Sequence, residues 1–162
     1  MDIFWEELVY GLPDARQLTR VIIRMIAATL LGAVVGIERE RAGKPAGVRT
    51  HMLVSLGTAV FVLACLAAGM QIEDMSRVIQ GIVTGIGFLG AGSILKLSEE
   101  RNIQGLTTAA GIWMTSAIGV AVGIGSLGVA LLSTFFTLII LALAGPFESW
   151  FHNRGREDDP DD

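Results

Sequence analysis

Five apolar runs of 18 to 20 residues dominate this sequence and leave few choices of fold. A helix needs about 20 apolar residues to cross the roughly 30 Å hydrocarbon core of a bilayer. Within hydrocarbon, every backbone N–H and C=O must be paired inside the protein, and an α-helix achieves this within one segment. The sequence therefore predicts an all-α membrane protein, a bundle of five transmembrane helices with glycine-rich packing faces, over residues 18–37, 52–69, 78–97, 106–124 and 127–144.

The composition fits a chain that lies mostly in lipid. Apolar residues make up 52% of the sequence, charged residues only 17%, and the mean hydropathy is +0.60. Soluble domains average about 25% charged residues. The net charge of −4 is due to five acidic residues after position 156, so no nucleic-acid partner is expected. We expect an interfacial segment at 1–17, a transmembrane domain at 18–151 whose last helix stops at Gly145–Pro146, and an acidic disordered tail at 152–162.

A charge-dense stretch, residues 36–51, separates the first two apolar runs. Gly43, Pro45 and Gly47 prevent it from continuing as one helix, so it predicts a loop at the membrane surface. Lys and Arg are more frequent on this side of the membrane than on the other, which places the loop and the C-terminus in the cytoplasm. The polar side chains of the stretch are predicted to form a cytoplasmic network of Glu38, Arg39, Arg41, Lys44, Arg49 and His51.

Three arginines, Arg16, Arg20 and Arg24, lie at the opposite end of the first run and oppose this orientation. An arginine near a helix end can extend its side chain to the lipid headgroups, whereas one in the hydrocarbon needs a partner. Two interpretations of Arg24 therefore stay open, a lipid phosphate contact and a buried carboxylate partner.

Three acidic residues are candidates for a cation site. Glu38 forms either an ordinary helix-end ion pair with Arg41, or coordinates a cation or pairs with a neighbouring loop. Glu73 and Asp74 begin a helix, where carboxylates favour the helix dipole, but they can also bind Mg²⁺, which prefers carboxylate oxygens. The sequence shows no nucleophile motif, histidine pair at metal-binding spacing or phosphate-binding loop, so we expect a non-enzyme without a resident cofactor.

The third apolar run is rich in glycine, and Gly81 and Gly85 have the G-x-x-x-G spacing. Small residues at this spacing let membrane helices approach closely, and two further pairs repeat it, Gly32–Gly36 and Gly119–Gly123. Close helix packing is the first expectation, and a hinge or a cavity lining is the alternative. The residues assigned to this packing face or cavity are Gly81, Gly85, Gly87, Gly90, Gly92, Thr107, Thr108 and Trp113.

Three blocks of the sequence resemble the MgtC/SapB family of bacterial inner-membrane proteins. They are G-I-E-R-E with K-P-A-G-V-R-T-H in 36–51, G-I-G-F-L-G-A-G in 85–92, and G-L-T-T-A-A-G-I-W in 105–113. The resemblance implies a five-span inner-membrane protein linked to magnesium homeostasis, growth at low Mg²⁺, acid stress and virulence. It also implies a short form, because many members carry a soluble ACT-like domain beyond the point where this sequence ends. Thr107 and Met114 stand where the virulence branch has Asn and Cys, so the virulence role does not transfer directly.

Two functions follow from these observations. The first is a non-enzymatic regulator of another membrane complex, such as an ion-transporting ATPase or ATP synthase, as the resemblance implies. The second is a small, homo-oligomeric transporter or channel for Mg²⁺ or another cation. The second function requires Glu38, Arg24 or the threonines of the fourth run to face a water-filled cavity.

Overall fold

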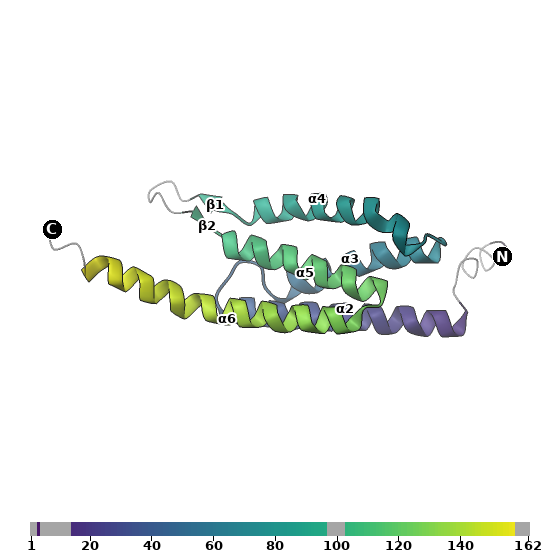
Figure 1. Ribbon diagram of the computed structural model, residues 1–162, viewed down its shortest axis with the longest axis horizontal. Coiled ribbons are helices and arrows are strands. Elements are labelled where there is room, and N and C mark those ends of the chain that lie inside the picture. Colours follow the sequence, from purple (N-terminus) through teal and green to yellow (C-terminus); the bar gives the residue numbers. More distant parts are fainter. Residues whose placement is uncertain (1–2, 4–13, 97–102, 158–162) are drawn as a thin grey trace.

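The computed structural model describes residues 3, 14–96 and 103–157, and in this part of the chain the helices lie side by side along one axis (Figure 1). The architecture is all-α, as predicted. Two short strands, β1 (Leu95–Lys96) and β2 (Ile103–Gln104), pair antiparallel in the connection between residues 92 and 106, with Leu95 opposite Gln104. The helices are α2 (Ala15–Arg41), α3 (Val48–Ala67), the 3-10 turn η1 (Ile72–Met75), α4 (Ser76–Gly92), α5 (Leu106–Ile124) and α6 (Leu127–Glu157).

The charge-dense stretch forms a shorter loop than predicted. α2 continues to Arg41 because Glu and Arg are good helix formers, and α3 already begins at Val48. The break between them holds all three predicted helix breakers, and Gly43 adopts a φ of +67° there. The predicted interruption is confirmed, but its length was wrong, since only residues 42–47 leave the helix.

Two other predicted boundaries were wrong. α4 ends at Gly92 rather than at residue 97, because the chain turns there into β1. α6 passes Gly145–Pro146 and reaches Glu157, inside the predicted tail. A proline removes one backbone hydrogen bond, and long membrane helices tolerate this loss. The fourth predicted helix is confirmed as α5, between Gly105 and Gly125 at positive φ. Most of the predicted interfacial segment and the last five residues of the chain lie outside the described residues.

α5 packs against all four other long helices of the bundle. α3 packs against α2 and α5, whereas α4 packs on α5 and barely touches α3. α6 covers the remaining side of α5 and α2. The main apolar cluster joins α2, α3, α5 and α6. It consists of Ala28, Val35, Ala59, Ile118, Val122, Ala130 and Leu141.

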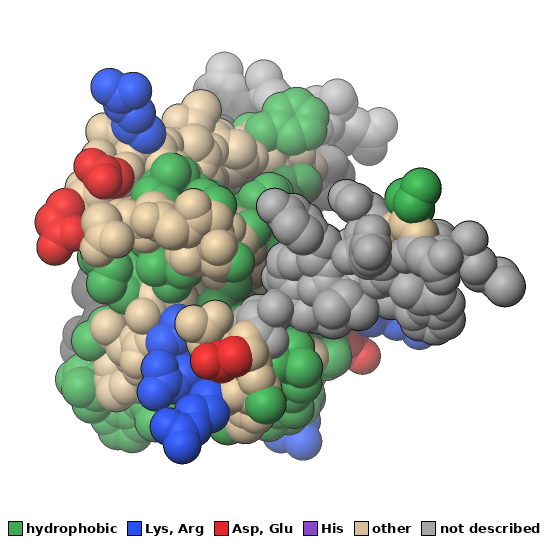
Figure 2. Space-filling model, turned by 90° about the vertical axis from the view of Figure 1, so that its right-hand side faces the viewer, with side chains coloured by type: hydrophobic (Ala, Val, Ile, Leu, Met, Phe, Trp, Pro, Cys, Tyr) green, Lys and Arg blue, Asp and Glu red, His purple; other side chains and the backbone are tan. Residues whose placement is uncertain are grey.

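Large apolar side chains cover the outside of the bundle. Phe88 is 82% exposed, Leu53 69% and Ile140 66%. Soluble monomeric proteins rarely expose apolar surface of this extent. Seen from the end at which α2 begins, Lys and Arg side chains lie at the upper edge and in a larger group lower down, with acidic side chains near both (Figure 2). Within the described residues, α2, α3 and α5 are each long and apolar enough to cross a bilayer, while the apolar part of α6, Leu127–Leu143, is shorter. These features indicate a membrane protein and support three of the five predicted spans.

Candidate functional site

An apolar groove of about 530 Å³ lies between α3, α4 and α5. Gly81 and Gly85 line it from α4, and Gly57 and Phe61 line it from α3. A Cβ atom added to any of these three glycines would meet no atom within 4 Å. The groove exists because α4 leans on α5 and leaves the surface of α3 uncovered.

The Gly81–Gly85 pair differs from the other two pairs of this spacing. A Cβ on Gly32 would lie 2.6 Å from the His51 carbonyl oxygen, so this pair brings α2 against α3. A Cβ on Gly123 would lie 2.7 Å from the Val62 Cβ, so its pair brings α5 against α3. Two of the three glycine pairs are therefore used for packing inside the chain, and the third faces the groove.

The other glycines of α4 divide in the same way. A Cβ on Gly90 would lie 3.6 Å from the Ala109 Cβ, which is the point where α4 rests on α5. Gly87 and Gly92 are exposed, with open space around them. The five glycines predicted to share one role therefore have three different surroundings: the α5 contact, the groove and the outer surface.

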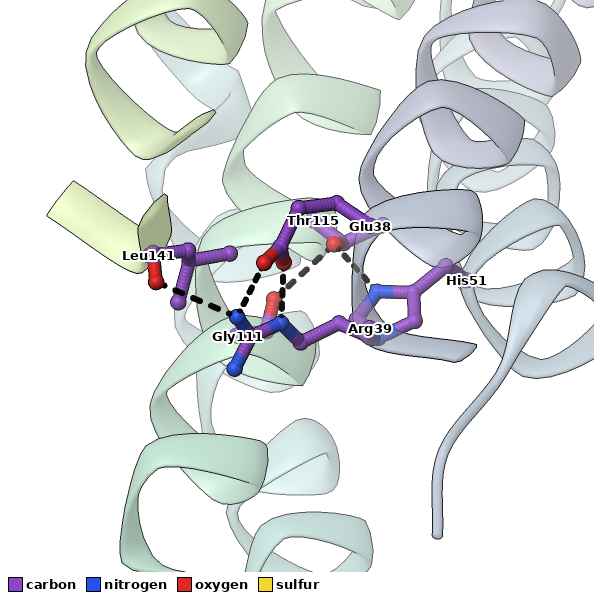
Figure 3. Close-up of polar contacts among 6 residues, drawn as sticks. All are labelled: Glu38, Arg39, His51, Gly111, Thr115 and Leu141. Atoms are coloured by element: carbon purple, nitrogen blue, oxygen red, sulfur yellow. Dashed lines mark hydrogen bonds and ion pairs between the residues drawn. The ribbon is translucent and has the colours of Figure 1, made fainter. Parts of the chain in front are cut away.

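A buried polar cluster lies between α2, α3, α5 and α6, near the 42–47 loop (Figure 3). The Arg39 side chain is only 2% exposed and donates hydrogen bonds to the Glu38 carboxylate from Nε and from Nη2, the latter over 2.6 Å. Arg39 Nη2 also lies 3.4 Å from the Leu141 carbonyl oxygen. Arg39 thus connects the end of α2 to α6.

His51 extends this cluster toward α5. Its Nδ1 lies 2.7 Å from the Thr115 Oγ1, and that hydroxyl donates to the Gly111 carbonyl oxygen over 2.9 Å. Because the hydroxyl has a single hydrogen, it accepts from His51, which therefore carries a hydrogen on Nδ1. Gly111 leaves room for both neighbours, since a Cβ there would lie 3.6 Å from His51 Cε1 and 4.0 Å from Arg39 Cδ.

A polar stripe continues from His51 into the middle of α3. Ser55 and Thr58 follow at the spacing of one helix face, and Thr58 Oγ1 lies 3.1 Å from the Ser116 Oγ. The sequence reasoning did not single out Ser55 or Thr58, although the i, i+4, i+7 spacing after His51 was a usable signal. Within the described residues, three buried side-chain atoms have no hydrogen-bond partner, His51 Nε2, Ser55 Oγ and Thr108 Oγ1.

The predicted cytoplasmic network separates into a buried and an exposed half. Glu38, Arg39 and His51 share the cluster of Figure 3, and Glu38 pairs with Arg39 rather than with Arg41. The exposed half consists of Arg41, Lys44 and Arg49. Glu40, which the sequence reasoning did not assign, accepts the backbone N–H of Val48 over 3.0 Å and so caps the start of α3.

The α5 residues assigned to the glycine helix lie in different places. Thr108 is fully buried, and Thr107 is half-buried. Trp113 lines a cavity of about 230 Å³ between α4 and α5, where it faces Ile82 and Ile86 rather than the glycines. Thr108 therefore lies within packed protein, and Trp113 lies at a cavity that the Gly81–Gly85 pair does not line.

The three acidic metal candidates do not converge. Glu38 is near the loop before α3, whereas Glu73 and Asp74 are exposed in η1, beyond the other end of α3. A helix of 20 residues is about 30 Å long, so these carboxylates lie at opposite ends of the bundle. No group of three or more metal-ligating side chains occurs within the described residues.

Arg24 has a partner that neither interpretation of the sequence included. Its Nη1 donates to the carbonyl oxygen of Gly123 over 2.9 Å, in the last turn of α5. Unpaired carbonyls at a helix C-terminus carry partial negative charge and favour a cation. Arg24 therefore caps α5, with its remaining N–H groups beside a cleft between α2 and α3.

Comparisons with known proteins give a consistent result. The family model described as "MgtC family" matches residues 25–150. The chain is 45% identical over 130 residues to Protein SrpB of Synechococcus elongatus, and 41% identical over 127 residues to "Putative magnesium transporter YhiD" of Escherichia coli strain K12. It is 43% identical over 117 residues to Protein MgtC of Salmonella typhimurium strain LT2. These matches cover 72–74% of this chain but 71%, 58% and 49% of the respective relatives. No solved structure matches the chain.

Proposed function

The chain belongs to the MgtC family, and from this premise we propose that it is a non-enzymatic inner-membrane protein of magnesium homeostasis that regulates another membrane complex by direct helix contact. The names of its relatives support the link to magnesium. In this proposal α4 and the apolar part of α6 complete five spans, with the 42–47 loop and the C-terminus in the cytoplasm. The partner is an ion-transporting ATPase, an ATP synthase or a complex of similar kind.

One observation carries the proposal, namely the open Gly81–Gly85 pair in the groove. In lipid, helices gain little from burying apolar surface and associate instead through close packing at small residues. This chain uses its other two pairs in that way, since at each of the four glycines an added Cβ would clash with an atom of α3. A transmembrane helix of a partner can approach α4 at the third pair as closely as α2 approaches α3.

The chemistry of the helix interiors favours regulation over cation transport. α3, α4 and α5 contain no Asp or Glu, while Mg²⁺ prefers carboxylate oxygens. Thr108 and Thr115 are fully buried, and neither lines a cavity among those found in the described residues. The threonines therefore give no support to a transport path. Arg24 does line a cleft, between α2 and α3, but Arg20 and Arg24 make its wall cationic, which disfavours a cation.

A small homo-oligomeric cation transporter or channel is the second candidate. The three unpartnered atoms His51 Nε2, Ser55 Oγ and Thr108 Oγ1 favour it, because a buried lone pair can accept from water or bind a cation. A second copy of the chain would have to complete the path, since one bundle encloses little volume.

Mg²⁺ flux into liposomes that contain the purified full chain separates the two functions. We expect no flux above that of empty liposomes, with circular dichroism confirming that the protein is folded. In a host whose growth at low Mg²⁺ changes when this chain is expressed, Gly85→Leu should remove the effect. Gly87→Leu is the matched control, because Gly87 lies on the same helix with open space but outside the groove. Flux that Glu38→Gln abolishes would overturn the proposal in favour of transport.

A further inference from the structure

A basic cleft of about 430 Å³ lies between α2 and α3, at the end of the bundle away from the 42–47 loop. Gln17, Arg20 and Arg24 line it from α2 at the i, i+3, i+7 spacing of one helix face. Leu63 and Leu66 line it from α3. The cleft therefore has a cationic wall and an apolar wall. Neither wall belongs to the apolar groove beside Gly81 and Gly85 or to the cluster around His51.

Arg24 is held rigidly at the cleft. Its guanidinium donates to the Gly123 carbonyl and packs so closely on Gly125 that any side chain at that glycine would strike it. Gly125 has a φ of +100°, which also favours glycine. One N–H of Arg24 is used in this way, and a guanidinium has five. The side chain is thus fixed in place with donors left over for a ligand.

The positive charges at the cleft are not compensated within the described residues. The one ion pair among the described residues joins Glu38 to Arg39, near the other end of α2 and away from the cleft. The nearest carboxylate in the sequence, Asp14, accepts the backbone N–H of Gln17 over 2.7 Å as the cap of α2. Like charges one turn apart on a helix repel each other, so Arg20 and Arg24 favour an anion between them.

The depth of the cleft matches the level of lipid headgroups. Arg24 precedes the end of α2 at Arg41 by 17 residues, which is about 26 Å of helix and close to the thickness of the hydrocarbon core. α3 and α5 also end at this level, at Ala67 and Ile124. Figure 2 looks onto this end and shows the larger group of Lys and Arg at the height of α2, with hydrophobic side chains and one acidic side chain near it.

We propose that this cleft is a binding site for the phosphodiester group of an anionic phospholipid. Arg20 and Arg24 donate to the phosphate oxygens, and Gln17 contacts the headgroup, while an acyl chain lies along Leu63 and Leu66. A soluble phosphate shares the anionic chemistry, but the apolar wall and the position at the bilayer border favour the lipid. A bound lipid phosphate also accounts for arginines on the side of the membrane that the Lys and Arg distribution assigns to the outside.

The test measures lipid binding to the purified full chain in detergent by native mass spectrometry. The probes are phosphatidylglycerol, phosphatidylcholine and inorganic phosphate. We expect phosphatidylglycerol to bind at least tenfold more tightly than phosphatidylcholine. Arg20→Gln should weaken phosphatidylglycerol binding at least fivefold. Arg16→Gln is the matched control, because Arg16 is exposed on the same helix but does not line the cleft, and it should change binding less than twofold.

Three results would overturn the proposal. Equal binding of the two lipids would show that only the apolar wall matters. Equal effects of Arg20→Gln and Arg16→Gln would show a diffuse charge effect without a site. Displacement of the lipid by inorganic phosphate at matching concentration would assign the cleft to a soluble anion. Arg20 is used because it is exposed and Arg24 also holds α5, and an unchanged melting temperature of Arg20→Gln confirms that the fold is intact.

Discussion

His51 donates a hydrogen bond from Nδ1 to the Thr115 Oγ1 over 2.7 Å, and this contact joins α3 to α5 in the buried centre of the bundle. Both side chains are fully buried. The Thr115 hydroxyl donates its own hydrogen bond to the Gly111 carbonyl oxygen, so the donor and the acceptor of both hydrogen bonds are defined. The Thr115 hydroxyl is therefore the acceptor that keeps the buried His51 N–H paired, and it adds to the glycine packing that already holds α3 against α5.

Thr115→Val tests this role of the hydroxyl. Valine keeps the shape but leaves a buried His51 N–H without an acceptor, which costs about 1–3 kcal/mol. Thr29→Val is the matched control, because the Thr29 hydroxyl is bonded only to the Met25 carbonyl of its own helix, and it should change stability by less than about 0.5 kcal/mol. Unfolding of the protein in mixed micelles measures both values. Equal losses in the two variants would contradict the assigned bond.

The Glu38–Arg39 pair predicts an asymmetry between its two partners. Glu38→Met leaves the Arg39 cation, 2% exposed, with only the Leu141 carbonyl, and removal of one partner of a buried pair costs about 3–5 kcal/mol. Arg39→Met should cost less, because Glu38 is 24% exposed and can turn its carboxylate to water. The same unfolding measurement ranks the two variants. A larger loss for Arg39→Met would show that Arg39 matters through its contact with α6 instead.

Glycine contacts predict opposite effects of alanine at two positions. A Cβ on Gly119 would strike the Ser55 carbonyl oxygen and lie 2.9 Å from the Thr58 Cβ, so Gly119→Ala should destabilise the protein by about 1–3 kcal/mol. Gly87 has open space, so Gly87→Ala should stabilise α4 by up to about 1 kcal/mol. Thermal melting in detergent compares the two. Similar melting temperatures would contradict the close approach of α5 to α3.

Much of the fold could be predicted from the sequence, because hydropathy and helix breakers act locally. The limits of α5 and the break around Gly43 follow from such local signals. The path of α6 through Pro146 could not be predicted, since a proline in a long helix is tolerated or not according to its surroundings. The identical spacing of the three glycine pairs likewise hid their different roles, because the spacing does not say which neighbour is present.

The candidate site was less predictable for the same reason. Glu38, Arg39 and His51 could be singled out as polar residues at the membrane border. Their neighbours Thr115 and Gly111 come from a helix that begins 55 residues after His51. The backbone partner of Arg24 in α5 lies 99 residues along the chain and leaves no trace in local sequence. Tertiary contacts of this kind become visible only once the helices are placed.

The central claim is that the α4 groove receives a helix of another membrane protein, and photo-crosslinking in native membranes tests it most directly. Leu89 lines the groove, whereas the neighbouring Phe88 is 82% exposed and does not. Benzoylphenylalanine at each position, in turn, reports what lies within reach of the side chain. We predict an adduct with a second, different membrane polypeptide from position 89 and none from position 88. No adduct, equal adducts from both positions, or an adduct only with a second copy of this chain would contradict the account.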